Sequence, residues 1–185
     1  MKLKLRLKTI SWVLASALLC SACQSWIPKA QGLATPQWVA QNYQRQDHIE
    51  VQWKSQSFSF LLYQQQHGQA LDMLALTLTG QQLFKLSFDG QRVHVEQRIN
   101  PMQHLPFDYV VRDILYATYP NFAALHVAQN TVVHKAETIY IQQQPVLNIQ
   151  HSEGVIELKN LQVPYQMVIS AVSNTLEDDQ GGDDE

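Results

Sequence analysis

Residues 71–96 read LDMLALTLTGQQLFKLSFDGQRVHVE, and this stretch is the clearest indication of the fold. Successive side chains of a β-strand point to opposite faces, so an apolar–polar period of two indicates a strand with one buried face. After Gly80 the alternation sets Phe84, Leu86 and Phe88 against Lys85, Ser87 and Asp89. The Asp89-Gly90 pair is a hairpin turn signal, and Val93 and Val95 resume the alternation behind it. The stretch therefore predicts antiparallel strands joined by tight turns.

The same rhythm extends outward on both sides of this stretch. In residues 57–62, Phe58, Phe60 and Leu62 fall on one face. Between 71 and 79 we expect Leu74, Leu76 and Leu78 to share the apolar face and Met73 and Ala75 to lie opposite. Beyond residue 136 the period of two returns in ETIYIQQQ, VLNIQHS, VIELKNLQ and YQMVISAV. The chain therefore predicts strands before and after a central break.

The break is the stretch 105–120, LPFDYVVRDILYATYP, which has a helical period. Its apolar residues Phe107, Val110, Val111, Ile114 and Leu115 recur at the spacing of one helical face. Pro106 suits the first turn and Pro120 stops the helix, so we expect a helix over 106–119. The fold class is α+β: a curved antiparallel sheet with one helix. Either the sheet fills its own interior, or the helix is a lid over a cavity.

The N-terminal residues have the pattern of an export signal. Four basic residues in MKLKLRLK precede about fourteen mostly apolar or small residues. A helix of that length reaches only ~20 Å, which is short for a ~30 Å hydrocarbon core. Residues 1–22 are therefore predicted to be a signal peptide.

Both cysteines of the chain, Cys20 and Cys23, lie at the end of this signal. The C-x-x-C spacing does not indicate haem attachment, because Gln24 and not histidine follows Cys23. It does not indicate a redox site either, because the pair lies at the end of an export signal and not between a strand and a helix. LCSAC resembles a bacterial lipobox, which implies that Cys23 is lipid-modified with acyl chains such as palmitate. Gln24 in place of aspartate then implies an outer-membrane lipoprotein that faces the periplasm. An ordinary secretory signal with incidental cysteines is the alternative.

The remaining sequence divides into three parts. Residues 23–47 contain two prolines and little alternation and are expected to form a lipidated tether, whereas residues 48–172 form the folded domain. Residues 173–185 carry six acidic residues and are expected to be a disordered tail. The net charge is −3 and the body has no basic stripe, so we expect no nucleic-acid partner.

No pattern of catalytic residues stands out. Seven histidines are scattered, and although His94 and Glu96 would share a strand face, no cysteine remains to complete a zinc site. The sequence has no G-x-S-x-G nucleophile motif and no phosphate-binding glycine loop. We therefore expect no metal, no cofactor and no enzymatic activity.

Residues 58–170 resemble a known family. The strand link T-x-x-G-Q-x-L-F at 77–84, the turn at Asp89-Gly90 and the helix ending in Tyr119-Pro120 are similar to lipoproteins of unknown function encoded beside aryl-polyene pigment biosynthesis in Gram-negative bacteria. The resemblance implies a fold like that of the LolA and LolB lipoprotein carriers, an incomplete β-barrel with a helical lid. It implies a protein that binds a hydrophobic lipid, such as an aryl-polyene lipid, and assists its transport or its placement in the outer membrane.

This resemblance gives two interpretations of the apolar face. The expected ligand contacts are Phe58, Phe60, Leu62, Leu74, Leu76, Leu78, Phe84, Leu86 and Phe88. The same residues equally suit a plain hydrophobic core. In that case the chain is a non-enzymatic scaffold or assembly lipoprotein that acts through an envelope protein, such as a transport protein.

Overall fold

The structure is a computed structural model, and it describes residues 30–172 apart from residues 36, 130 and 131. The predicted signal peptide, Cys23 and the predicted acidic tail lie outside the described residues.

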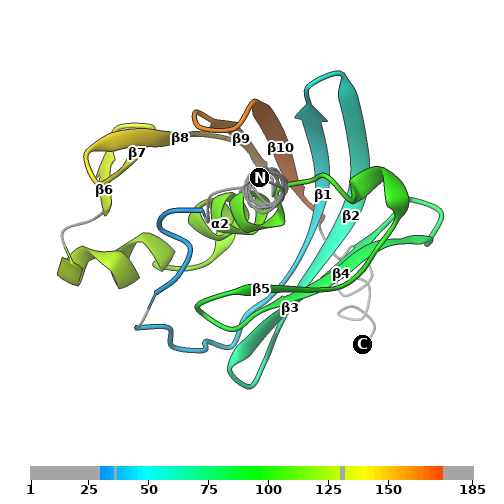
Figure 1. Cartoon of the computed structure of the whole chain (residues 1–185), viewed down its shortest axis with the longest axis horizontal. Helices are drawn as coiled ribbons and strands as arrows, with labels where there is room; N and C mark the ends of the chain where they lie inside the picture. The colour runs from blue at the N-terminus through cyan, green and yellow to red at the C-terminus, as the bar shows by residue number, and fades with distance from the viewer. Residues whose placement is uncertain (1–29, 36, 130–131, 173–185) are drawn as a thin grey trace, which may run out of the picture.

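An unclosed antiparallel sheet dominates the described part of the chain, which forms ten strands (Figure 1). The strands are β1 Gln44–Trp53, β2 Gln56–His67, β3 Ala70–Leu76, β4 Gln82–Phe88, β5 Val93–Arg98, β6 Val132–Lys135, β7 Thr138–Ile141, β8 Gln144–Ser152, β9 Val155–Asn160 and β10 Tyr165–Ala171. Their order across the sheet is β5-β4-β3-β2-β1-β10-β9-β8-β7-β6. This arrangement confirms the predicted α+β class and the curved antiparallel sheet.

The order of the strands shows how the chain builds the sheet. Strands β1 to β5 pair in succession outward to one edge, and strands β6 to β10 pair in succession inward from the other edge. The first and last strands meet in the middle, where Ile49 lies opposite Ile169 and Val51 opposite Met167. Strands β5 and β6 remain as edges, so the sheet is unclosed.

A helical connection joins the two edges. It consists of η2 Asn100–Met102, α2 Phe107–Thr118 and η3 Phe122–Gln129. Helix α2 lies inside the curve of the sheet (Figure 1), and it confirms the helix expected over 106–119 with one residue fewer at each end. Tyr119 has an extended backbone, as expected of the residue before Pro120.

One part of the predicted burial pattern is wrong. Strand β3 buries Leu71, Met73 and Ala75, whereas Leu74 and Leu76 lie on the outer face and Leu78 is 69% exposed in the turn that follows. Both faces of this strand are apolar, so its own alternation does not decide which face is buried. The pairing with β4 decides it, because the inward side chains of Leu86 and Phe84 lie opposite Met73 and Ala75.

The folded part of the chain begins before residue 48. Strand β1 starts at Gln44, and Ala30, Leu33 and Tyr43 are buried in the hydrophobic core. Part of the stretch expected to be a tether is therefore packed against the sheet and helix.

Candidate functional site

The concave face of the sheet is a continuous apolar surface in contact with α2. Phe60 on β2 packs edge-on against Phe84 on β4 at a centroid distance of 5.5 Å, and Phe84 packs edge-on against Phe107 of α2 at 5.1 Å. Val111 and Leu115 of the helix are both fully buried. Helix side chains thus occupy the space that the curved sheet encloses.

Most of the predicted ligand contacts belong to this concave face. Phe60, Leu62, Phe84, Leu86 and Phe88 are all 2% exposed or less, and Phe58 is half-buried near the start of β2. The expectation that Leu74, Leu76 and Leu78 would join them is wrong, because these three side chains lie on the outer face or in a turn. Whether the six remaining residues contact a ligand stays a prediction.

Helix α2 buries a charged pair that the periodicity did not reveal. Arg112 and Asp113 are both fully buried, and Arg112 Nε donates to Asp113 Oδ1 over 2.7 Å. Asn160 Nδ2 donates to Asp113 Oδ2 over 2.6 Å, and the Tyr165 hydroxyl donates to the same oxygen. Burial raises the pKa of Asp113, and the Arg112 charge and these hydrogen bonds oppose that rise.

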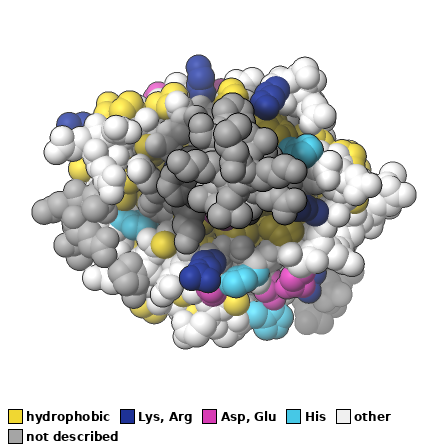
Figure 2. Space-filling view, in the orientation of Figure 1, with side chains coloured by type: hydrophobic (Ala, Val, Ile, Leu, Met, Phe, Trp, Pro, Cys, Tyr) yellow, Lys and Arg dark blue, Asp and Glu magenta, His cyan; other side chains and the backbone are white. Residues whose placement is uncertain are grey.

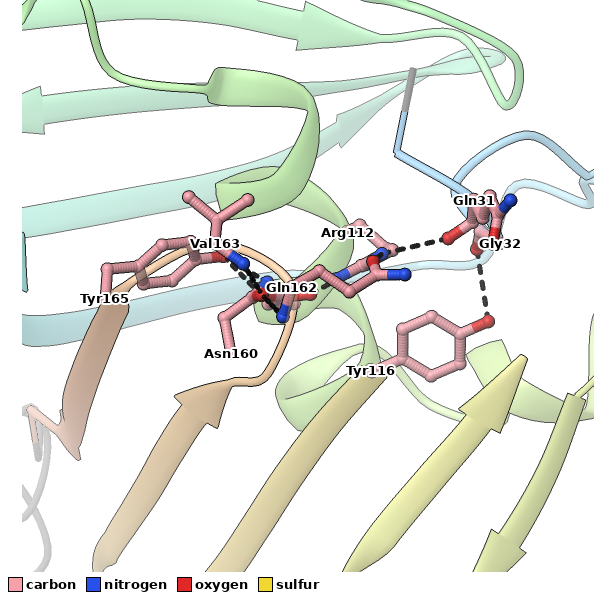
Figure 3. Close-up of polar contacts among 9 residues, drawn as sticks. Gln31, Gly32, Arg112, Tyr116, Asn160, Gln162, Val163 and Tyr165 are labelled. Atoms are coloured by element: carbon pink, nitrogen blue, oxygen red, sulfur yellow. Dashed lines mark hydrogen bonds and ion pairs between the residues drawn. The ribbon is translucent and has the colours of Figure 1, made fainter. Parts of the chain in front are cut away.

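This pair connects α2 to the turn between β9 and β10 (Figure 3). Arg112 Nη1 donates to Gln162 Oε1 over 3.0 Å, while Asn160 Oδ1 accepts the backbone N–H groups of Gln162 and Val163. Arg112 Nη2 is buried without a hydrogen-bond partner among the described residues. Burying this ion pair with an unsatisfied N–H group costs folding free energy, so the interior of this protein does not have the composition that would give the highest stability.

A cluster of aromatic side chains surrounds the C-terminal end of α2. Tyr119 lies 4.8 Å from Tyr43 and 5.0 Å from Trp38, measured between ring centroids, and Phe122 lies 5.0 Å from Tyr116. Burial raises the pKa of Tyr43 to about 12, so its hydroxyl stays protonated and donates to Thr118. The cluster is an apolar, ring-rich wall beside the concave face.

His126 of η3 completes the wall. It is 2% exposed, stacks on Tyr116 at 6.0 Å and meets Phe122 edge-on at 5.3 Å. Its Nε2 has no hydrogen-bond partner in the described part of the chain, and burial lowers its pKa. The imidazole is therefore neutral near pH 7 and acts as an aromatic packing group.

Two contacts between histidine and carboxylate side chains lie on the surface. His94 lies 3.0 Å from Asp89 and His67 lies 3.1 Å from Asp72, while Glu96 pairs with Lys85 instead of joining His94. Figure 2 shows histidine and acidic side chains next to one another near the lower rim of the face in view. Among residues 30–172 as described, no group of three or more His, Cys, Asp or Glu is placed to hold a metal ion.

Several hollows lie outside the concave face. Hollows of about 320 and 370 Å³ on the outer side of the central strands are lined mainly by polar residues such as Gln52, Glu157 and Gln166. A smaller one of about 190 Å³ lies between Leu33, Val93 and Asp108, at the start of α2.

The fold and the site define an α+β protein in which an unclosed antiparallel sheet wraps one central helix. The chain belongs to the family of proteins of unknown function DUF3261, whose model matches residues 44–173. A comparison with curated proteins found no match. None of the described helices is long and apolar enough to span a membrane.

Proposed function

We propose that this protein is a lipid-anchored, periplasmic binding protein for a hydrophobic ligand, and that it assists the transport or outer-membrane placement of a lipid such as an aryl-polyene lipid. One observation carries the proposal: an incomplete antiparallel barrel presents a continuous apolar concave face to a single helix. The unclosed, curved sheet with a helix inside it supports the proposal. The proposed activity is binding, without a cofactor or a chemical step.

In this proposal, α2 is the lid, and acyl or polyene chains replace its contacts with the sheet. Phe60, Phe84 and Leu86 would then contact ligand instead of Phe107 and its neighbours. A ligand would have to compensate for the exposure of helix residues such as Val111 and Leu115, because these side chains are fully buried against the sheet. The aromatic wall of Trp38 and Tyr119 adds flat ring faces that favour a conjugated ligand.

The proposed anchor puts this site near the bilayer. Cys23 precedes Ala30, the first described residue, by seven positions. At no more than about 3.6 Å per residue, the lipidated cysteine lies within about 25 Å of the folded body. The anchor would therefore keep the start of the folded body close to the membrane surface.

The binding proposal is tested on the chain beginning at Gln24, which keeps every described residue. We expect it to carry co-purified lipid in native mass spectrometry and to increase the fluorescence of N-phenyl-1-naphthylamine. Leu86→Trp fills the concave face and should lower the uptake of the dye, whereas Leu78→Trp in the exposed turn should leave it unchanged. Absence of lipid and dye from the parent chain would exclude the proposal.

The anchor proposal is tested in cells with a fatty-acid probe. We expect Cys23→Ser to abolish labelling and Cys20→Ser to retain it. Labelling that survives in Cys23→Ser would overturn the assignment.

A second candidate function is supported by the outer face of the sheet. Leu74 and Leu76 are half-buried there, and Leu78 is 69% exposed beside them. In this second proposal these three side chains are the surface that a scaffold lipoprotein would offer to a protein partner. Photo-crosslinking from position 78 to a single envelope protein, together with no lipid uptake, would favour this candidate.

A further inference from the structure

The segment that precedes β1 runs along α2. We call residues 30–35 and 37–43 the strap. The Gln31 carbonyl accepts a hydrogen bond from Arg112 Nη1 over 3.1 Å, and the Gly32 carbonyl accepts one from the Tyr116 hydroxyl over 3.1 Å (Figure 3). Arg112 and Tyr116 are one helical turn apart, so they face the same side of α2. The start of the strap is thereby fastened to the middle of the helix.

The strap also contacts the C-terminal end of the helix. Tyr43 donates its hydroxyl to Thr118 Oγ1 over 3.1 Å, and the backbone N–H of Gln41 donates to the Tyr119 hydroxyl over 3.3 Å. Contacts from two parts of the strap therefore hold α2 near its middle and at its end.

The same segment is fixed to the sheet on its other side. The backbone N–H of Thr35 donates to the Gly90 carbonyl over 2.8 Å, and Trp38 Nε1 donates to the Gln69 carbonyl over 2.8 Å. A Cβ on Gly90 would lie 2.4 Å from the Trp38 side chain, which shows how closely the strap approaches the turn between β4 and β5. The strap thus bridges the helix and the turns that join β2 to β3 and β4 to β5.

Gly32 is a second position at which the strap approaches its neighbours closely. It has φ +76°, and a Cβ there would lie 2.4 Å from Ile141 Cδ1 and 2.9 Å from the Tyr116 hydroxyl oxygen. Only glycine combines this backbone conformation with so little space. The strap is seated between α2 and β7 at this residue.

From these contacts we propose that the strap fastens α2 against the concave face, and that its release is one of the steps that free the helix, beside the breaking of the Asp113 contacts with Asn160 and Tyr165. The inference deepens the proposed function, since it rests on that function for what the uncovered face then binds. Because the strap begins within seven residues of Cys23, the proposed membrane anchor and the lid helix are linked by one short stretch of chain.

The test compares two alanine substitutions in the chain beginning at Gln24. Gly32→Ala introduces a Cβ where neighbours already lie, whereas Gly154→Ala, at φ +71°, introduces one where nothing lies within 4 Å. Both variants have a similar backbone cost, so Gly154→Ala is the matched control. We expect the α2 amides of Gly32→Ala to exchange with deuterium roughly tenfold faster than those of the control, with β1 and β2 unchanged.

Tyr116→Phe is the second variant, because it keeps the ring and removes only the hydrogen bond to Gly32. We expect it to accelerate exchange in α2 selectively, by roughly threefold to tenfold. If Gly32→Ala fails to fold, the exchange rate of the α2 amides in Tyr116→Phe alone tests the inference. Exchange in α2 that matches the control, or acceleration spread evenly over α2, β1 and β2, would overturn the inference.

Uptake of N-phenyl-1-naphthylamine separates this inference from the proposed function. Faster α2 exchange without dye uptake in any variant would support the strap and contradict ligand binding. Dye uptake by the parent chain with unchanged α2 exchange in both strap variants would support ligand binding and contradict the strap.

Discussion

Asp113→Asn is expected to cause a large loss of stability. The substitution keeps the size of the side chain but leaves the fully buried Arg112 without its counter-charge. It also places an amide where one carboxylate oxygen accepts hydrogen bonds from both Asn160 and Tyr165. Breaking a buried ion pair by removing one partner costs about 3 to 5 kcal/mol. Domains are commonly stable by only about 5 to 15 kcal/mol, so this is a substantial fraction.

The free energy of unfolding is measured by urea denaturation of the chain beginning at Gln24, with far-UV circular dichroism as the signal. In a thermal scan the same loss lowers the midpoint by about 6 to 20 °C. Glu96→Gln is the control, because it removes the charge of the exposed Lys85–Glu96 pair and should leave the midpoint unchanged. A cost for Asp113→Asn below about 1 kcal/mol would refute the reasoning, since that is the range of ordinary substitutions.

Two further predictions concern the face of β3 and the pH response. Met73→Ala removes a side chain that is 1% exposed and should lower the free energy of unfolding by about 2 to 5 kcal/mol. Leu78→Ala, at a residue that is 69% exposed, should change it by less than about 0.5 kcal/mol in the same urea assay. A larger loss for Leu78→Ala than for Met73→Ala would mean that the leucine face of this stretch is the buried one, as the sequence predicted. Burial lowers the pKa of His126 in the folded state, so the contribution of His126 is present above its unfolded pKa of about 6.5 and is lost as the pH falls through the lower folded value. His126→Phe keeps the aromatic packing and should flatten this pH dependence, and an identical slope in both proteins would rule out His126 as its source.

The sequence predicts the strands and the helix well, because each has a clear period. Phe84, Leu86 and Phe88 alternate with polar residues, so their buried face could be identified before the structure was known. Leu74 and Leu76 could not be assigned in this way, since Met73 and Ala75 offer an equally apolar second face. Only pairing with β4 separates the two faces, and pairing is a property of the whole sheet.

The buried polar cluster was missed for a related reason. Helical periodicity marks one apolar face and assigns Arg112 and Asp113 to solvent, but α2 lies inside a curved sheet that covers more than one side of it. The partners of Asp113 are Asn160 and Tyr165, far along the chain and separated from α2 by several strands. The sequence offers one weak signal, an Arg-Asp pair flanked on both sides by apolar residues.

The meeting of β1 with β10 has a consequence for how the domain assembles. Hairpins such as β1–β2 and β8–β9 are local, but the seam between β1 and β10 closes only after the last strand has been synthesised. The two halves of the sheet can therefore pair only after both have been synthesised, and until then the segment containing α2 is the covalent link between their far edges. Removal of either terminal strand would divide the sheet at its centre, whereas trimming β5 or β6 would only shorten it at a margin.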